Sequence, residues 1–315
     1  MSRIKPRPVS PGGLIGIVAP SSPVDPAALA EGIARLQAFG YRVLVGEHVL
    51  DQKGHLAGED AARAADFNRI WANPEVEAVL CARGGYGAMR MLEQIDWELV
   101  RRHPKFFCGF SDVTALHLAM AKEADLVTFH GPMVAAFGEA LVYNAEGLLR
   151  AMQEREPLGE IAWPAPIDGQ PPRPVTLRPG VAEGRLMGGN LSLLVSLIGT
   201  RWEPDLDGSI LLLEEVDEPP YRVDRMLTQL RLAGKLQGVR GVLFGDSPSC
   251  LTRSDGRPSH HLHEVLGELL GDLSVPLLYG FPCGHTAYRA TLPLGVRVRL
   301  DAAAGSLTIL EPALA

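Results

Sequence analysis

Ser111 lies where an apolar segment is followed at once by a helical pattern. The apolar segment covers residues 106–110, and the helical pattern runs over residues 112–123. A serine on a turn between a strand and a helix presents its hydroxyl beyond the strand end, and the next backbone N–H lies at a helix N-terminus, where negative charge is stabilised. This pattern favours a nucleophile. It departs from the G-x-S-x-G motif, because Val113 stands at the second glycine position, and a serine here is also a favoured helix cap.

Two other residues have the chemistry that a serine nucleophile requires, namely a base and an acid that orients the base. His285 lies in a loop with glycine and proline after a predicted strand at 275–279, and histidine titrates close to neutral pH. Glu214 ends an apolar strand, at the carboxyl end where parallel sheets carry function. Each has a structural alternative: His285 would bond a backbone carbonyl, and Glu214 would pair with Arg222 or Arg225.

A glycine-rich loop, Arg83-Gly84-Gly85-Tyr86-Gly87, follows another apolar segment. Glycines let backbone N–H groups approach a ligand closely. The loop is neither a P-loop nor G-x-G-x-x-G, so it is a tight turn, a phosphate cradle or part of an oxyanion hole. In the last case the N–H groups of Gly85 and Asp112 would be the two donors. Arg83 would either bind a substrate carboxylate through two hydrogen bonds or form a structural ion pair.

A histidine cluster, His260-His261-Leu262-His263-Glu264, is a candidate for metal binding, but it is not an H-E-x-x-H motif. We expect it to begin a helix with solvated histidines. Asp246 follows a strand, where it would contact a ligand or cap a turn.

Short apolar segments alternate with helical patterns over the first 140 residues, which predicts a parallel sheet covered on both faces. The predicted strands are 14–20, 41–45, 76–81, 106–110 and 126–129, and the predicted helices are 26–39, 60–72, 87–95 and 112–123. The proline-rich stretch from about 137 to 183 shows little periodicity and predicts a crossover between two domains. Beyond it we predict helices at 191–198 and 221–233, strands at 209–214, 239–245 and 275–279, and a hairpin of 296–300 with 306–310.

The composition is that of a globular protein, with 46% hydrophobic and 21% charged residues in a chain of 315. A net charge of −7 without a basic stripe argues against nucleic-acid binding. No apolar run approaches the roughly 18–20 residues of a membrane span, and the N-terminus has no signal-peptide pattern. The four scattered cysteines include no C-x-x-C pair and are typical of reduced, buried thiols in a cytoplasmic protein.

Taken in order, several segments resemble the serine L,D-carboxypeptidases, the muramoyl-tetrapeptide carboxypeptidase family, which includes the microcin C immunity peptidases. The resemblance spans nearly the whole chain, and its specificity lies in the shared order of short motifs. The matching segments are G-I-V-A-P-S-S at 16–22, the loop 83–87, G-F-S-D at 109–112, G-G-N-L at 188–191, L-E at 213–214, Y-R-V-D-R-M at 221–226, G-H-T at 284–286 and L-P-L-G at 292–295.

The resemblance implies an α/β protein. A flavodoxin-like parallel sheet would form an N-terminal domain at 1–140, followed by a crossover at 141–183 and a smaller, mixed α/β C-terminal domain at 184–315. It also implies a triad in a groove between the domains, with Ser111 as nucleophile, His285 as base and Glu214 as the orienting acid. A homodimer with no metal or organic cofactor is implied as well. Glu215 is the alternative acid, and Glu214 is preferred because it directly follows the apolar strand.

We therefore expect a cytoplasmic serine carboxypeptidase that removes the terminal D-alanine from murein tetrapeptides in cell-wall recycling. Its partner would be the murein peptide, with no nucleic acid and no membrane. The loop 287–290 lacks the small and polar residues expected there, which leaves the substrate preference open. One alternative is an immunity-type peptidase that cuts peptidyl or aminoacyl nucleotides. A more distant alternative is a non-catalytic ligand-binding protein on a flavodoxin-like sheet.

Overall fold

The computed structural model describes residues 3–137, 142–165, 174–251 and 259–315. The chain forms two compact units. The first comprises Met1–Glu156, Ala290–Gly295 and Pro312–Ala315, and the second comprises Pro157–Arg289 and Val296–Glu311. Parts of the predicted crossover, residues 141 and 166–173, lie outside the described residues.

The first unit is built on a six-stranded sheet in the order β12-β5-β4-β3-β1-β2. Five strands are parallel in the flavodoxin-like order 2-1-3-4-5, and β12 is antiparallel to β5 at one edge. Every residue of β1, β3 and β4 except Glu77 is buried, as expected of central strands covered on both faces. The strands are β1 (Leu14–Val18), β2 (Arg42–Val45), β3 (Val76–Cys81), β4 (Phe106–Gly109), β5 (Thr128–His130) and β12 (Leu292–Leu294).

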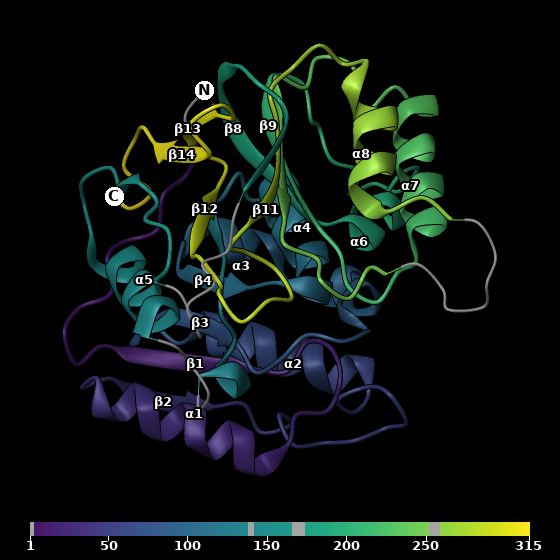
Figure 1. Cartoon of the computed structure of the whole chain (residues 1–315). Helices are drawn as coiled ribbons and strands as arrows, with labels where there is room; N and C mark the ends of the chain where they lie inside the picture. The colour runs from purple at the N-terminus through teal and green to yellow at the C-terminus, as the bar shows by residue number, and fades with distance from the viewer. Residues whose placement is uncertain (1–2, 138–141, 166–173, 252–258) are drawn as a thin grey trace. The chain divides into compact units, whose positions relative to one another are not determined.

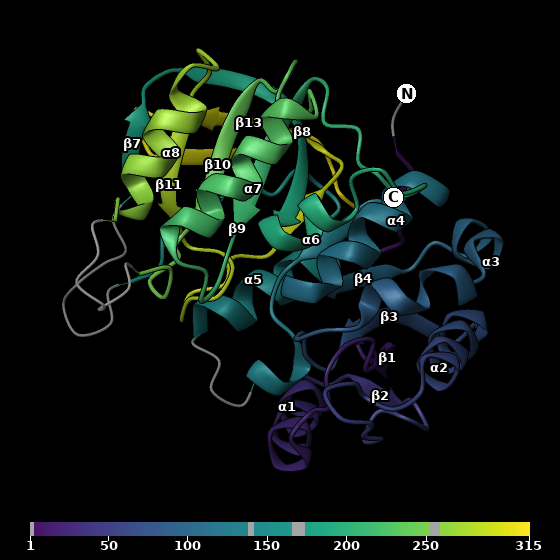
Figure 2. The same cartoon turned by 90° about the vertical axis from the view of Figure 1, so that its right-hand side faces the viewer.

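Helices cover both faces of this sheet. Figures 1 and 2 show α2, α3 and α4 along one face, with α1 and α5 on the other. The α1 helix begins where the sequence predicts, because Asp25 accepts the N–H of Ala28 at 2.9 Å and Pro26 occupies the first turn. The helices are α1 (Pro26–Ala38), α2 (Asp60–Ala72), α3 (Trp97–Arg102), α4 (Thr114–Glu123) and α5 (Val142–Gln153), with 3₁₀ turns η1 (Ala88–Gln94), η2 (Ser111–Val113) and η3 (Val134–Ala136).

The second unit contains an eight-stranded mixed sheet in the order β6-β14-β13-β8-β9-β10-β11-β7. Its centre, β8 to β11, is parallel, and the flanking strands are antiparallel. Figure 2 shows α7 and α8 side by side on one face. The strands are β6 (Gly159–Glu160), β7 (Val175–Arg178), β8 (Val181–Asn190), β9 (Ser209–Glu214), β10 (Gly241–Gly245), β11 (Leu277–Phe281), β13 (Arg297–Asp301) and β14 (Ser306–Ile309), and the helices are α6 (Leu191–Ser196), α7 (Pro220–Leu232) and α8 (Leu262–Gly271).

The predicted fold class is confirmed, but several elements were not predicted, among them α5 and β8. The α5 helix lies in the stretch that showed little periodicity, and its buried side chains include Ala145, Leu148 and Met152. Tertiary packing therefore stabilises a helix that its local sequence, with Gly147 inside, indicates weakly. Strand β8 is rich in glycine, which is depleted in strands. Gly184 and Gly188 are required there, because a Cβ atom at either would overlap the main chain of the neighbouring residues 208–212.

Candidate functional site

Ser111 has a backbone conformation that few serines adopt. Its φ is +64°, in the left-handed region, which costs an ordinary residue roughly 1–2 kcal/mol. Ser111 begins the 3₁₀ turn η2, with Phe110 alone between it and the end of β4, and α4 starts three residues later. It is not the N-cap of either helical segment, because those positions belong to Phe110 and Val113. Strain of this kind persists where the surroundings hold the residue in place, and it occurs often at functional sites.

A buried histidine fixes the chain just before Ser111. His117 lies on α4 and is 1% exposed. Its Nε2–H donates to the Gly109 carbonyl at 2.9 Å, and its Nδ1 accepts from the Thr128 hydroxyl at 2.8 Å. Burial lowers the pKa of His117 to about 3, so the ring is neutral at physiological pH and can hold this tautomer. The sequence does not indicate a role for His117, because it lies in a largely apolar helical segment and its hydrogen-bond partners come from other elements.

The glycine loop after β3 lies directly against Ser111. A Cβ atom on Gly84 would stand 2.9 Å from the Ser111 Cβ and 3.1 Å from its Oγ, so only glycine fits. Gly85 has a φ of +117°, and the next N–H, of Tyr86, donates to the Ser22 hydroxyl at 3.0 Å. The structure thus brings together Ser111 and the loop that carries the predicted oxyanion donor Gly85.

The other two predicted residues of this unit have different surroundings. Asp112 is 2% exposed and accepts the N–H of Ala88 at 2.8 Å. Burial raises the pKa of its carboxyl group, and the hydrogen bond from the Ala88 N–H opposes that rise. Arg83 is exposed, and its Nη1 donates to the Pro23 carbonyl at 3.1 Å.

In the second unit, His285 and Glu214 form a close pair. Nδ1 of His285 lies 2.7 Å from Oε2 of Glu214. Glu214 is fully buried at the end of β9, whereas the side chain of His285 is 22% exposed. A carboxylate at this distance accepts the Nδ1 proton, which leaves Nε2 as the basic atom of the neutral ring.

Two glycines make room for this pair. Strand β10 lies between β9 and β11, so the loop after β11 must cross the end of β10 to reach Glu214. A Cβ on Gly245, the last residue of β10, would stand 2.7 Å from the Cys283 carbonyl oxygen. Gly284 has a φ of +86°, and a Cβ there would stand 2.8 Å from the Glu214 carboxylate. Both positions therefore require glycine.

Glu215, the neighbouring carboxylate, has a different set of contacts. It accepts hydrogen bonds from the Asn190 amide at 3.1 Å, from the Ser192 N–H at 2.9 Å and hydroxyl at 2.7 Å, and from the Val216 N–H at 2.9 Å. Burial raises the pKa of Glu215 despite these bonds. Glu215 thus binds the first turn of α6, and the carboxylate that faces the imidazole of His285 is Glu214.

The arginines proposed as alternative partners of Glu214 have other contacts. Arg222 pairs with Glu218 at 3.2 Å, and the guanidinium of Arg225 lies 5.7 Å from the centre of the Tyr221 ring. Asp246 is half-buried, and burial raises the pKa of its carboxyl group. Its backbone N–H donates to the carbonyl of Phe281, the last residue of β11, at 2.9 Å, so Asp246 lies beside the start of the loop that carries His285.

The histidine cluster begins α8, as expected. His261 is the N-cap and shares a capping box with Glu264, and the rings of His261 and His263 are stacked. Among the residues that the structure describes, no group of three or more His, Cys, Asp or Glu side chains has the arrangement of a metal site.

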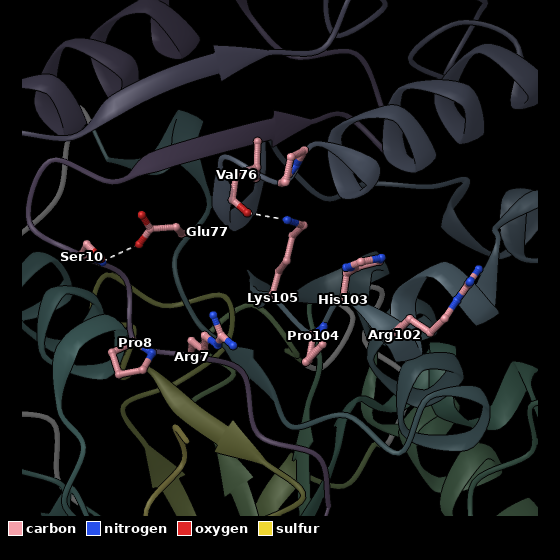
Figure 3. Close-up of a pocket in the computed structure, with 10 residues that line it drawn as sticks. Arg7, Pro8, Ser10, Val76, Glu77, Arg102, His103, Pro104 and Lys105 are labelled. Carbon is pink, nitrogen blue, oxygen red and sulfur yellow. Dashed lines mark hydrogen bonds between the residues drawn. The ribbon is translucent and has the colours of Figure 1, made fainter.

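A cavity of about 490 Å³ lies at the opposite, amino-terminal ends of β3 and β4. Figure 3 shows that two of its polar side chains have protein partners, since Lys105 donates to the Val76 carbonyl and Glu77 accepts the Ser10 N–H. Arg102 contacts Glu98. The cavity is lined by Arg7, Pro8, Ser10, Pro74, Val76, Glu77, Arg102, His103, Pro104 and Lys105, none of which is a predicted site residue.

Two further observations bear on the sequence predictions. All four cysteines are buried and free of disulfides. Across the described part of the chain, no helix has the length and apolar character of a membrane span.

Comparison with known proteins gives matches over both units. A family model described as the LD-carboxypeptidase N-terminal domain matches residues 15–131, and one described as the LD-carboxypeptidase C-terminal domain matches residues 183–300. A putative carboxypeptidase of Streptomyces coelicolor is 42% identical, covering 99% of this chain and 97% of its own. A probable murein peptide carboxypeptidase of Bacillus subtilis is 38% identical over 95% of this chain and 92% of its own. The structure of the microcin C7 self-immunity protein MccF, an inactive mutant without ligand, superposes with a TM-score of 0.91 at 26% identity over 99% of both chains.

Proposed function

This chain belongs to the LD-carboxypeptidase family, and we propose that it releases the terminal D-alanine from murein tetrapeptides by serine catalysis. The bond cut is the amide between the L-centre of meso-diaminopimelate or lysine and D-alanine. The relative named as a murein peptide carboxypeptidase supports this substrate, because it is 38% identical over nearly the full length of both chains.

In the proposed reaction, Ser111 is the nucleophile and His285 the general base. The Ser111 oxygen attacks the scissile carbonyl while Nε2 of His285 takes the hydroxyl proton. The imidazolium then gives that proton to the departing D-alanine nitrogen as the C–N bond breaks. A water molecule next attacks the acyl-enzyme while His285 takes a proton from that water. His285 then returns the proton to the Ser111 oxygen as the ester bond breaks, which restores the serine hydroxyl and releases the shortened peptide.

Glu214 is the orienting acid in this proposal. The observation that carries it is the 2.7 Å contact between Glu214 Oε2 and His285 Nδ1. The buried carboxylate fixes the tautomer with its proton on Nδ1 and stabilises the imidazolium that forms during attack. The contacts of Glu215 with Asn190 and Ser192 support a structural role for that neighbour.

The developing oxyanion would be held by the N–H groups of Gly85 and Asp112. The contact of Gly84 with the Ser111 side chain and the position of Asp112 immediately after it support this assignment. Arg83, on the same loop and exposed, would bind the terminal carboxylate of the substrate. A change of Arg83 to Met should then raise KM more than it lowers kcat.

The test is to incubate the protein with a murein tetrapeptide and follow release of D-alanine by mass spectrometry. Cleavage by the wild type, with none by Ser111→Ala, His285→Ala or Glu214→Ala, supports the triad. A tetrapeptide ending in L-alanine is the control for stereochemistry. Full activity of Ser111→Ala would remove the mechanism.

A second candidate is a peptidase of the microcin immunity type. The TM-score of 0.91 against MccF favours it, whereas the lower identity, 26% against 38%, favours the murein peptide. An acyl-sulfamoyl nucleoside assayed beside the tetrapeptide separates the two, since the better substrate has the higher kcat/KM.

We also propose a homodimer located in the cytoplasm. Light scattering after size-exclusion chromatography tests the dimer, and cell fractionation tests the location. A monomeric mass at all concentrations measured would contradict the dimer. Recovery of the protein outside the cytoplasmic fraction would contradict the proposed location.

A further inference from the structure

Two buried charged side chains outside the proposed triad hold the glycine loop after β3. Arg63 on α2 and Asp112 are each 2% exposed. The Asp112 carboxylate accepts the N–H of Ala88 at 2.8 Å. From the other direction, Nη1 of Arg63 donates to the Gly87 carbonyl at 3.0 Å. Both polar groups of the peptide unit between Gly87 and Ala88 are therefore bonded to buried side chains, and we call Arg63 and Asp112 the loop clamp.

The loop clamp also joins the glycine loop to the rest of the sheet. Arg63 Nη1 donates to the Pro20 carbonyl beyond the end of β1, and Nη2 pairs with Asp60 at 2.5 Å. The ends of β1 and β3 flank the point where the strand order reverses, where flavodoxin-like sheets bind ligands. One guanidinium thus bonds the backbone that follows both strands at this point.

The glycine loop has little capacity to hold its own shape. It contains Gly84, Gly85 and Gly87, and the last two have φ values of +117° and +127°. Glycine loses more conformational freedom on ordering than any other residue, so such a loop needs contacts from outside. The clamp supplies them at one end of the loop, and Ser111 lies against the other end, at Gly84.

We propose that Arg63 and Asp112 are positioning residues that hold the Gly85 N–H where the oxyanion forms. The inference rests on the proposed function, because it assigns the clamp a role in acyl transfer. Neither side chain touches the reacting atoms. The clamp acts when the oxyanion appears, so its loss lowers kcat and leaves KM nearly unchanged.

The experiment compares Arg63→Met and Asp112→Ala with the wild type in two assays. The first measures kcat and KM on the murein tetrapeptide. The second measures inhibition by a peptide aldehyde, whose hemiacetal with Ser111 carries the same oxyanion. We expect kcat and the aldehyde affinity to fall about 10- to 100-fold in both variants, with KM within about threefold, because small displacements of catalytic groups have effects of this size.

Two further variants separate positioning from folding. Asp112→Asn keeps an oxygen acceptor and should recover most of the aldehyde affinity, whereas Arg63→Lys keeps the charge but loses the second bond and should remain weakened. Arg69→Met is the matched control, since Arg69 lies on the same helix and is paired, at the surface, with Glu47 and Asp66. It should leave kcat, KM and aldehyde affinity unchanged.

Outcomes for the clamp and for the proposed function are distinguishable. Unchanged aldehyde affinity in Arg63→Met and Asp112→Ala, with Ser111→Ala inactive, overturns the clamp alone. A fully active Ser111→Ala overturns the proposed function. If Arg63→Met and Asp112→Ala do not fold, Arg63→Lys decides. A kcat and an aldehyde affinity equal to those of the wild type in Arg63→Lys would overturn the clamp.

Discussion

Replacing Glu214 by Gln tests the proposed triad with the smallest change in shape. The buried carboxylate lies 2.7 Å from Nδ1 of His285, and the reaction places a positive charge on that ring. Two unit charges about 4 Å apart attract by about 4 kcal/mol at an effective dielectric constant of 20. Since about 1.4 kcal/mol of activation free energy is a factor of ten in rate, Glu214→Gln should lower kcat about a thousandfold. An amide NH₂ facing Nδ1 would also favour the wrong tautomer.

The same change should not destabilise the fold. Glu214 is fully buried, and its Oε1 has no hydrogen-bond partner among the described residues. A neutral amide removes the cost of burying this charge, so urea unfolding should give a free energy within about 1 kcal/mol of the wild type. Loss of rate without loss of stability would indicate a residue kept for chemistry.

Glu215→Gln is the matched control, one position along the same segment. Its carboxylate accepts bonds from Asn190, Ser192 and Val216, so the change should cost roughly 2 kcal/mol of unfolding free energy. The folded fraction should keep its kcat. The triad assignment fails if Glu214→Gln retains more than about a tenth of the wild-type kcat at unchanged KM. The reverse pattern, with Glu215→Gln inactive, would move the role of the acid to Glu215.

Three further predictions follow from the backbone and the buried groups. Ser111→Gly should have a free energy of unfolding about 1 kcal/mol higher than that of Ser111→Ala in urea unfolding, because φ is +64° at this position. Equal stability of the two variants would contradict the strain. Gly284→Ala should lower both the stability and kcat, since its added Cβ would contact the Glu214 side chain. Gly40→Ala is the control, because φ is +90° there and the space around it is open, so it should lower the stability alone. A similar kcat for the two variants would refute the contact between residue 284 and Glu214. His117, whose pKa is about 3 in the folded state, binds its proton more readily when unfolded, so its contribution to stability is complete above pH 6.5 and falls as the pH drops. By linkage, the free energy of unfolding should fall by about 2 kcal/mol between neutral pH and pH 5. Urea unfolding of the wild type and of His117→Gln at several pH values checks this. Equal dependence of the unfolding free energy on pH below about 6.5 in the two proteins would argue against the assignment.

The order of strands and helices could be predicted because each element has a local signal. The segment 76–81 is followed by the glycine-rich loop 83–87, and Asp25 with Pro26 marks a helix start, so β3 and α1 could be predicted with nearly correct bounds. Strand β8 and helix α5 were missed because their glycines oppose the local preference, and only the neighbouring backbone or buried packing explains them.

Candidate site residues could be chosen from the sequence, but their contacts could not. The positions of Ser111, Glu214 and His285 after apolar segments made them candidates, whereas Glu214 and Glu215 are chemically identical neighbours. Adjacent residues of an extended chain point their side chains to opposite faces of the sheet, so only one of the two glutamates can face His285. Which one it is depends on the path of the loop that crosses the end of β10. The supporting residues His117 and Arg63 gave no signal, because a polar side chain on a helix face is ordinarily solvated.

The sequence by itself determined the parallel α/β pattern, the motif order and the residue types available for acyl transfer, since these depend on periodicity and composition along the chain. Tertiary structure decided the left-handed turn at Ser111, the pairing of His285 with Glu214 and the burial of Arg63 and Asp112 around the glycine loop. These features join segments far apart in the chain. Their free energy comes from burial and hydrogen bonds between elements, which local sequence does not record.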